Sequence, residues 1–294
     1  MLLGVAMATA VVQPSVLVAA PYVLLGFVLG MRRLGVFVAC LLGAVVLTWG
    51  APRDALWYLE RGWAALVGGW FVALTLRQPQ AAFSERALAA VAGAVAVAAV
   101  LVGVRSGAWT SVEWAVGERI SQGVGTALDA LRLMRGGEAL PPALVTAVHE
   151  TVEAQKKVFP ALLGISSMAS LGVAWWVYMR LSSGSDQGVG PLREFRFNDH
   201  LVWVFIMGLL LLVTRWEDIL ARVGANTVVF MGALYALRGA AVILFLSGGL
   251  SLFGYVLLAF GLVFLPPLVL TGAMVIGIGD TWLDVRRKLG SSPA

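Results

Sequence analysis

Residues 2–30 read LLGVAMATAVVQPSVLVAAPYVLLGFVLG, and none of these side chains carries a charge. A helix that crosses the hydrocarbon core of a bilayer needs about 20 consecutive apolar residues. This stretch is longer than one crossing, and Gln13-Pro14 and Pro21 interrupt it. We therefore expect one kinked or tilted transmembrane helix that ends at Arg32-Arg33, with a broken pair of half-helices as the alternative.

The composition of the whole chain agrees with this beginning. Of the 294 residues, 60% are hydrophobic and 13% are charged, whereas a soluble domain has about 45–50% apolar and about 25% charged residues. So little charge cannot cover a water-facing surface, which excludes an ordinary soluble enzyme, a disordered chain and a coiled coil. The single cysteine, Cys40, excludes an internal disulfide and a cysteine-based metal site.

Uncharged runs of bilayer length recur along the chain and predict an all-α, polytopic transmembrane helical bundle of about eight spans (seven to nine). The predicted spans after the first are 34–51, 55–76, 82–104, 158–181, 199–214, 226–247 and 250–278. The chain then divides into four N-terminal spans in 1–104, an insert at 105–157, four C-terminal spans in 158–278 and a basic tail at 279–294.

The insert at 105–157 is too polar to cross a membrane. Apolar residues recur in it every three or four positions, from Val112 to Leu131 and again from Val145 to Val152, with charged residues between them. This spacing predicts two amphipathic helices, separated by Gly136-Gly137. Two interpretations are open: a helical hairpin packed on its own membrane domain, or a membrane-surface or partner-binding helix pair.

The basic residues predict the orientation of the chain. The formal net charge of +5 is spread over short loops, which suits anionic membrane lipids rather than nucleic acid. Lys and Arg are more numerous on the side that holds the insert and the tail. The positive-inside rule therefore predicts a multi-pass protein of the bacterial inner (plasma) membrane with both termini and the insert in the cytoplasm.

Arg238 is the clearest candidate for a functional side chain, because a charge at bilayer depth is costly and marks a functional hypothesis. It lies near the middle of the predicted seventh span, one turn after Tyr235. An arginine there could hold an anionic group with two parallel hydrogen bonds. The alternative is a structural arginine that is paired with a carboxylate or bonded to carbonyl groups.

Other polar residues have a structural interpretation beside the functional one. Glu60 could be the counter-charge of Arg238 or an interfacial residue near the start of its span. Asn226 could contact a ligand or be the N-cap of the seventh span. Asp199-His200 fits capping or anchoring at the membrane interface better than a proton relay. Asp280 or Thr281 would cap a helix in the tail.

Catalytic motifs are missing from the sequence. It has no phosphate loop, no G-x-S-x-G turn and no histidine placed with a serine and an acid. The stretch His149 to Glu153 reads H-E-x-x-E and lacks the second histidine of a zinc protease. We therefore expect a protein that is not an enzyme and that has no cofactor and no metal site.

The second half of the chain carries a family resemblance. Residues 192–203 read LREFRFNDHLVW, and this segment, with Gly224-Ala225-Asn226, 235–242 and 277–287, resembles the YybS-like family of bacterial multi-pass membrane proteins, a domain of unknown function. The similarity covers roughly 158–288 in sequence and the first hundred residues in hydropathy. Where the family usually has a proline before the sixth span, this chain has Asn198.

That family has been grouped with the substrate-binding S components of energy-coupling-factor transporters and with the rod-shape protein MreD. The resemblance therefore implies either a small-solute-binding transport subunit that works with an ATPase module, or a membrane scaffold for cell-envelope or division proteins. S components dock on their coupling subunit through an A-x-x-x-A face of the first helix, which Ala6 and Ala10 match here. Six spans are usual for S components, so eight spans and the insert depart from that pattern.

Overall fold

The computed structural model describes residues 13–50, 53–105, 107–184, 189–214, 218–249, 251–284, 286 and 288. Over these residues the chain is helical and has no strand, which confirms the predicted all-α class. The chain forms two compact units, Met1–Val189 and Gly190–Ala294.

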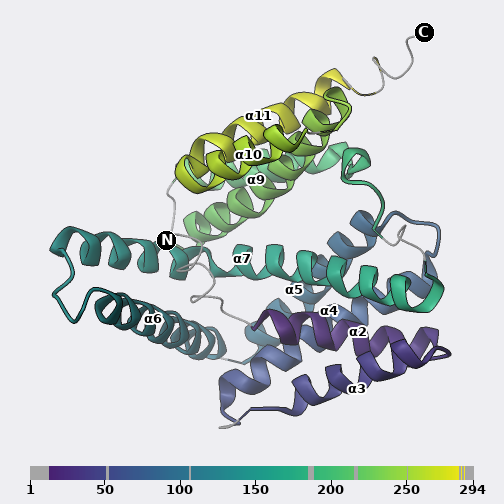
Figure 1. The fold of residues 1–294 in the computed structure, drawn as a ribbon, viewed down its shortest axis with the longest axis horizontal. Coiled ribbons are helices and arrows are strands. Elements are labelled where there is room, and N and C mark those ends of the chain that lie inside the picture. Colours follow the sequence, from purple (N-terminus) through teal and green to yellow (C-terminus); the bar gives the residue numbers. More distant parts are fainter. Residues whose placement is uncertain are drawn as a thin grey trace. The chain divides into compact units, whose positions relative to one another are not determined.

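The first unit contains six described helices (Figure 1). They are α2 (Pro14–Leu29), α3 (Leu34–Thr48), α4 (Ala55–Arg77), α5 (Phe83–Val104), α6 (Ala108–Met134) and α7 (Pro142–Ser183). The boundaries follow from local chemistry. Pro14 is the first residue of α2, where a missing N–H costs nothing. The Asp54 side chain caps α4 by accepting a hydrogen bond from the Trp57 N–H at 2.7 Å.

Helix α2 lies at the centre of this unit, packed against α3, α4 and α7. Glycine allows the close contacts. A Cβ on Gly68 of α4 would lie 3.0 Å from Cα of Pro21, and one on Gly43 of α3 would lie 2.8 Å from the Val23 side chain. Small residues at such positions let helix backbones approach each other in lipid, where packing rather than water drives association.

The amphipathic insert is packed on the unit that contains it. Val116, Ile120 and Val124 of α6 are buried in one apolar cluster whose other members are Val16, Leu17, Ala20, Ala64, Val148, Val152 and Phe159. The structure thus favours the first of the two interpretations of the insert. It also joins the second insert helix to the following span, because α7 is continuous over 42 residues, and Figure 1 shows α6 beside its first half.

The second unit contains the 3-10 turns η1 (Leu192–Glu194) and η2 (Asp199–Leu201) and the helices α8 (Val202–Thr214), α9 (Asp218–Leu246), α10 (Leu252–Phe264) and α11 (Pro266–Leu283). Helix α9 packs against both α8 and α11. A Cβ on Gly224 of α9 would lie 2.8 Å from the carbonyl oxygen of Gly208 in α8, so Gly224 permits close helix packing. Helix α9 runs through Gly224 without a break.

Three expectations for this unit are wrong. Asn226 is not an N-cap, because α9 begins eight residues earlier at Asp218. The predicted span 250–278 is two helices, since Pro266-Pro267 cannot continue the hydrogen bonding of α10 and the helix breaks at Leu265. Asp280 and Thr281 do not cap a tail helix, because α11 runs through them to Leu283.

Helices of membrane-crossing length and hydropathy occur in both units. In the described part of the chain, four are long and apolar enough: Phe83–Val104, Pro142–Ser183, Ile219–Leu246 and Pro266–Leu283. Four more apolar helices are shorter: Pro14–Leu29, Leu34–Thr48, Asp199–Thr214 and Leu252–Phe264. Helix α4, predicted as the third span, is in neither group. The chain is thus a helical membrane bundle, and the number of eight crossings stays a prediction.

Candidate functional site

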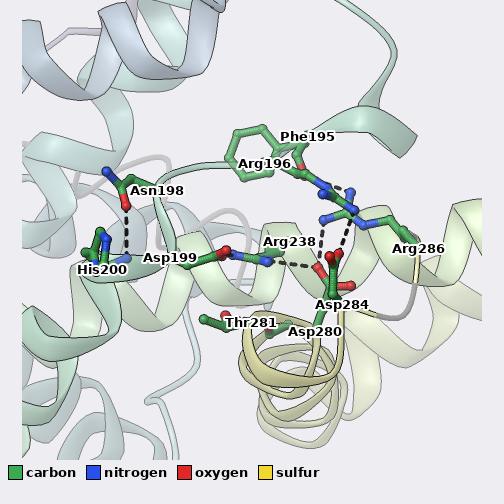
Figure 2. Close-up of polar contacts among 11 residues, drawn as sticks. Phe195, Arg196, Asn198, Asp199, His200, Arg238, Asp280, Thr281, Asp284 and Arg286 are labelled. Carbon is green, nitrogen blue, oxygen red and sulfur yellow. Dashed lines mark hydrogen bonds and ion pairs between the residues drawn. The ribbon is translucent and has the colours of Figure 1, made fainter. Parts of the chain in front are cut away.

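Arg238 is buried in the second unit and is bound by two carboxylates (Figure 2). Its Nε donates to Oδ2 of Asp280 at 2.9 Å, and its Nη1 donates to Oδ1 of Asp199 at 2.6 Å. The arginine is 2% exposed and Asp280 is 1% exposed, whereas the Asp199 side chain is 62% exposed. Charge-assisted hydrogen bonds of this length are among the strong ones in proteins.

Two glycines bring the helices of this pair together. A Cβ on Gly239 of α9 would overlap the carbonyl of Ala273 in α11, and one on Gly277 would overlap the carbonyl of Tyr235. The backbones of α9 and α11 are therefore in direct contact at this crossing. Arg238 precedes one glycine and Asp280 lies three residues after the other, so the crossing places the guanidinium beside the carboxylate.

Arg286 binds the same carboxylate from the other side. Its Nη2 donates to Asp280 Oδ2 at 2.8 Å, and its Nη1 donates to the carbonyls of Arg193 and Phe195 at 3.2 and 3.0 Å. Both arginines thus share Oδ2 of Asp280, while Oδ1 is buried and has no hydrogen-bond partner in the described part of the chain. Through these hydrogen bonds, α9, α11 and the segment around η1 are all linked to the Asp280 carboxylate and its two arginines.

The charges of this cluster balance. Asp284 pairs with Arg196 at 3.3 Å beside the buried groups. With this pair included, the cluster has three arginines and three aspartates: Arg196, Arg238, Arg286, Asp199, Asp280 and Asp284. A guanidinium whose charge is neutralised from within the chain gains little by binding an external anion. This geometry favours the structural interpretation of Arg238.

Aromatic side chains enclose the cluster on one side. The Tyr235 ring is buried and makes edge contacts with Phe197 and Phe205, at 5.2 and 5.7 Å between ring centroids. The Arg238 guanidinium lies 5.5 Å from the centroid of Phe197. Tyr235 and Arg238 are therefore together in the structure, as their spacing on one helix requires.

The other candidate residue of α9 lies away from this contact network. Asn226 donates from Nδ2 to the carbonyl oxygen of Arg222 at 2.9 Å, a bond within its own helix. A different asparagine, Asn198, is the N-cap of the 3-10 turn η2. Its side chain accepts a hydrogen bond from the His200 N–H at 3.0 Å, which fixes the turn that contains Asp199 (Figure 2).

Glu60 belongs to the first unit and has its own cationic partners. Glu60 is 3% exposed, and its carboxylate lies 3.8 Å from Arg61 and 3.7 Å from Arg119. Both distances are too long for a hydrogen bond. The Gln13 backbone interacts with the carboxylate, and Oε1 is buried with no hydrogen-bond partner among the described residues. The carboxylates that pair with Arg238 are Asp199 and Asp280, so the structure gives no support to Glu60 as its counter-charge.

A cavity of about 590 Å³ borders Glu60 at the end of the unit where α3 ends and α4 begins. Its lining comes from α3, α4, α6 and the start of α2: Gln13, Ser15, Val45, Val46, Trp49, Gly50, Asp54, Leu56, Trp57, Glu60, Arg61 and Arg119. The wall is apolar over much of its extent and has a few charged groups, the usual character of a small-molecule site.

The two arginines that line the cavity differ in how fully their hydrogen-bond donors are used within the chain. Arg61 donates to three carbonyls, those of Leu47, Trp49 and Trp57, at 2.6, 2.9 and 3.3 Å. It therefore caps the C-terminal end of α3, as cations do. Arg119 comes from the insert helix α6, and its side chain is 34% exposed. It is the cation of this site that has capacity for a further partner.

Sequence reasoning singled out Arg238 and Glu60 but missed their surroundings. The sequence favours capping or anchoring for Asp199 and capping for Asp280, and it marks Arg119 only as one of the charged residues of the amphipathic insert. A helical pattern continued through residue 283 would have placed Asp280 inside α11. The docking pair Ala6 and Ala10 lies outside the described residues. Within the described part of the chain, no group of three His, Cys, Asp or Glu side chains could hold a metal ion.

The fold and the two clusters define a multi-pass helical membrane protein with buried charge. Comparison with known families gives the same class. The sequence profile of the family described as "Predicted membrane protein (DUF2232)" matches residues 1–281, and the chain belongs to that family. This agrees with the resemblance to a membrane family of unknown function and extends it over the first hundred residues. No curated protein and no solved structure matches the chain.

Proposed function

We propose that the chain is a non-enzymatic, small-solute-binding subunit of a membrane transport system, and that the solute occupies the Glu60 cavity. One observation carries the proposal: Glu60 lines a cavity of about 590 Å³, and its buried Oε1 has no hydrogen-bond partner among the residues that the structure describes. Ligand sites of proteins typically enclose about 300–1,000 Å³. An unsatisfied buried acceptor costs free energy, and a solute that supplies a donor would recover it.

The proposal moves the binding site from Arg238 to Glu60. Two aspartates already neutralise Arg238, with contacts of 2.6 and 2.9 Å. A solute anion would have to displace one of them, and breaking a buried pair is costly. The ion pairs of Glu60 with Arg61 and Arg119 are longer, at 3.8 and 3.7 Å, so a solute donor can bind Oε1 without breaking a short ion pair.

With the predicted orientation, the cavity lies toward the cytoplasmic side of the membrane. The loop between α3 and α4 lies beside the cavity, and the positive-inside rule assigns this loop to the cytoplasm of a bacterial inner-membrane protein. The insert helix α6 forms part of the same wall through Arg119. We propose that an ATPase module binds on this side, where a change at the insert would reach the solute site directly.

Purification of the tagged chain from its own membranes in mild detergent, with mass spectrometry of the partners, tests this proposal. A transport role predicts recovery of an ATPase pair together with a coupling membrane subunit, in stoichiometric amounts. An untagged strain is the control for proteins that bind the resin. Recovery of cell-wall or division proteins without any ATPase would contradict the transport role.

A membrane scaffold for cell-envelope or division proteins is the second candidate. The cluster around Asp280 favours it, since a network of paired charges that ties several segments together serves rigidity rather than ligand exchange. The same purification separates the two functions. A scaffold predicts stable protein partners whose recovery does not change when the Glu60 cavity is altered by Glu60→Gln.

A further inference from the structure

We infer that the solute of the Glu60 cavity is a small zwitterion with an apolar side group, bound through an ammonium at Glu60 and a carboxylate at Arg119. This inference rests on the proposed function and names the class of solute. It follows from three features of the cavity: one acceptor, one cation and the sum of charges.

The acceptor is Oε1 of Glu60. Within the described part of the chain it is buried without a hydrogen-bond partner, and the ion pairs with Arg119 at 3.7 Å and Arg61 at 3.8 Å are too long for hydrogen bonds. A buried carboxylate prefers donors that are themselves charged, since such bonds are about twice as strong as neutral ones. An ammonium group of the solute meets this requirement.

The cation is Arg119. Arg61 already donates to the carbonyls at the end of α3, and the Asp54 carboxylate accepts from the Trp57 N–H. Among the described residues Arg119 has one ion pair, the long one with Glu60, and about a third of its side chain is exposed. Its planar guanidinium can bind a carboxylate with two parallel hydrogen bonds. The solute therefore needs an anionic group next to its ammonium.

The sum of charges favours a solute without net charge. Asp54 and Glu60 balance Arg61 and Arg119 along the wall. A solute with one net charge would leave that charge uncompensated in a partly apolar enclosure, and burial of an unpaired charge is expensive. A zwitterion adds no net charge to the cavity. The side chains of Val45, Val46 and Leu56 in the lining offer an apolar surface for its side group.

Three probes that share one ring test the inference: L-phenylalanine, the cation phenethylamine and the anion 3-phenylpropionate. Their binding to the full-length protein in lipid nanodiscs is measured by equilibrium dialysis with radiolabelled compounds. We expect L-phenylalanine to bind, and each singly charged probe to bind about 10- to 100-fold more weakly, the loss expected from one charged hydrogen bond.

Two variants test which residue of the protein binds each charged group of the zwitterion. Glu60→Gln is expected to lower the affinity for phenylalanine and leave that for 3-phenylpropionate unchanged. Arg119→Gln is expected to lower the affinity for phenylalanine and leave that for phenethylamine unchanged. Arg132→Gln is the matched control, because Arg132 belongs to the same helix but pairs with Asp129 and is absent from the cavity lining. Thermal unfolding of each variant verifies that it folds.

The outcomes separate this inference from the proposed function. Binding of a singly charged probe as tightly as phenylalanine would overturn the zwitterion and leave a solute site in place. Equal binding by wild type and both cavity variants would place the zwitterion site elsewhere and overturn the inference. Failure of all three probes to bind would overturn the inference and the solute site together.

Discussion

The two units each bury a carboxylate among arginines, yet the two carboxylates differ in how they are held. Asp280 in the second unit accepts two charge-assisted hydrogen bonds, at 2.8 and 2.9 Å, from Arg286 and Arg238. Glu60 in the first unit lies 3.7 and 3.8 Å from its cations and borders a cavity. Each carboxylate has one buried oxygen that makes no hydrogen bond with the described residues.

This difference shows that burial of a charge does not by itself identify a ligand site. A buried ion has to be compensated. Where the chain supplies that compensation at hydrogen-bonding distance, as at Asp280, the group is structural. Where the chain leaves the distances long beside an open volume, as at Glu60, an external partner can complete the pair. The depth of Arg238 in its helix marks a charge that the chain itself compensates.

The largest expected effect is at Asp280. Asp280→Asn removes the charge that holds two buried arginines, and breaking a buried pair costs about 3–5 kcal/mol. We expect the free energy of unfolding, measured by reversible unfolding in mixed detergent and SDS micelles, to fall by this amount. The comparison of the two units depends on this result.

The matched control is Asp129→Asn. Asp129 pairs with Arg132 on the exposed face of α6 at 2.9 Å, a similar distance without burial. Exposed pairs contribute about 0–1 kcal/mol. If both variants lost the same small amount, the Asp280 cluster would not be a structural tie.

Sequence could single out Arg238 but not its partners. A lone charge inside an apolar run is visible without a structure, and its cost implies a counter-ion. Asp199 and Asp280 are 39 and 42 residues away along the chain. Their pairing depends on a helix crossing where Gly239 and Gly277 bring backbones into contact, and nothing in either sequence segment fixes that crossing. A capping role was therefore the simpler local interpretation of both aspartates.

A smaller but still large effect is expected where the insert docks on the first unit. Ile120→Ala removes a side chain that is 1% exposed in the cluster with α2 and α7, and such truncations cost about 2–5 kcal/mol. Leu133→Ala, on the exposed face of the same helix, serves as the control and should leave the free energy of unfolding nearly unchanged. A neutral Ile120→Ala would mean that α6 is not held on the bundle and that Arg119 need not face Glu60.

The sequence predicts the apolar face of the insert but not the surface on which that face packs. The spacing of Val116, Ile120 and Val124 predicts an apolar stripe, and this stripe is present. Periodicity does not say what covers a stripe, because a lipid surface, a partner or the chain's own helices bury the same residues. The cavity depends on this missing information, since Arg119 reaches Glu60 only when α6 lies on α2 and α4.

The crossing of α9 and α11 offers an intermediate test in the second unit. Gly277→Ala would push a Cβ into the Tyr235 carbonyl, and overpacking typically costs about 1–3 kcal/mol. Gly279→Ala places the same methyl group two residues further along α11, where nothing lies within 4 Å. We expect a loss of stability for the first variant and none for the second, measured in the same SDS titration. Equal effects would indicate that the backbones are not in contact at Gly277.

The smallest expected change in stability is at Glu60, and it distinguishes the two clusters most sharply. Glu60→Gln is the same acid-to-amide substitution as Asp280→Asn, at a site that is equally buried. The substitution loses two long ion pairs, which lowers stability a little. It also removes the cost of keeping a charge out of water, which raises stability, so the two effects largely cancel. We expect the free energy of unfolding to change by less than about 1 kcal/mol, within the range of an exposed substitution such as Glu85→Gln. A loss as large as that of Asp280→Asn would mean that Arg61 and Arg119 hold Glu60 as a structural ion, and the cavity would then lose the free acceptor on which solute binding depends.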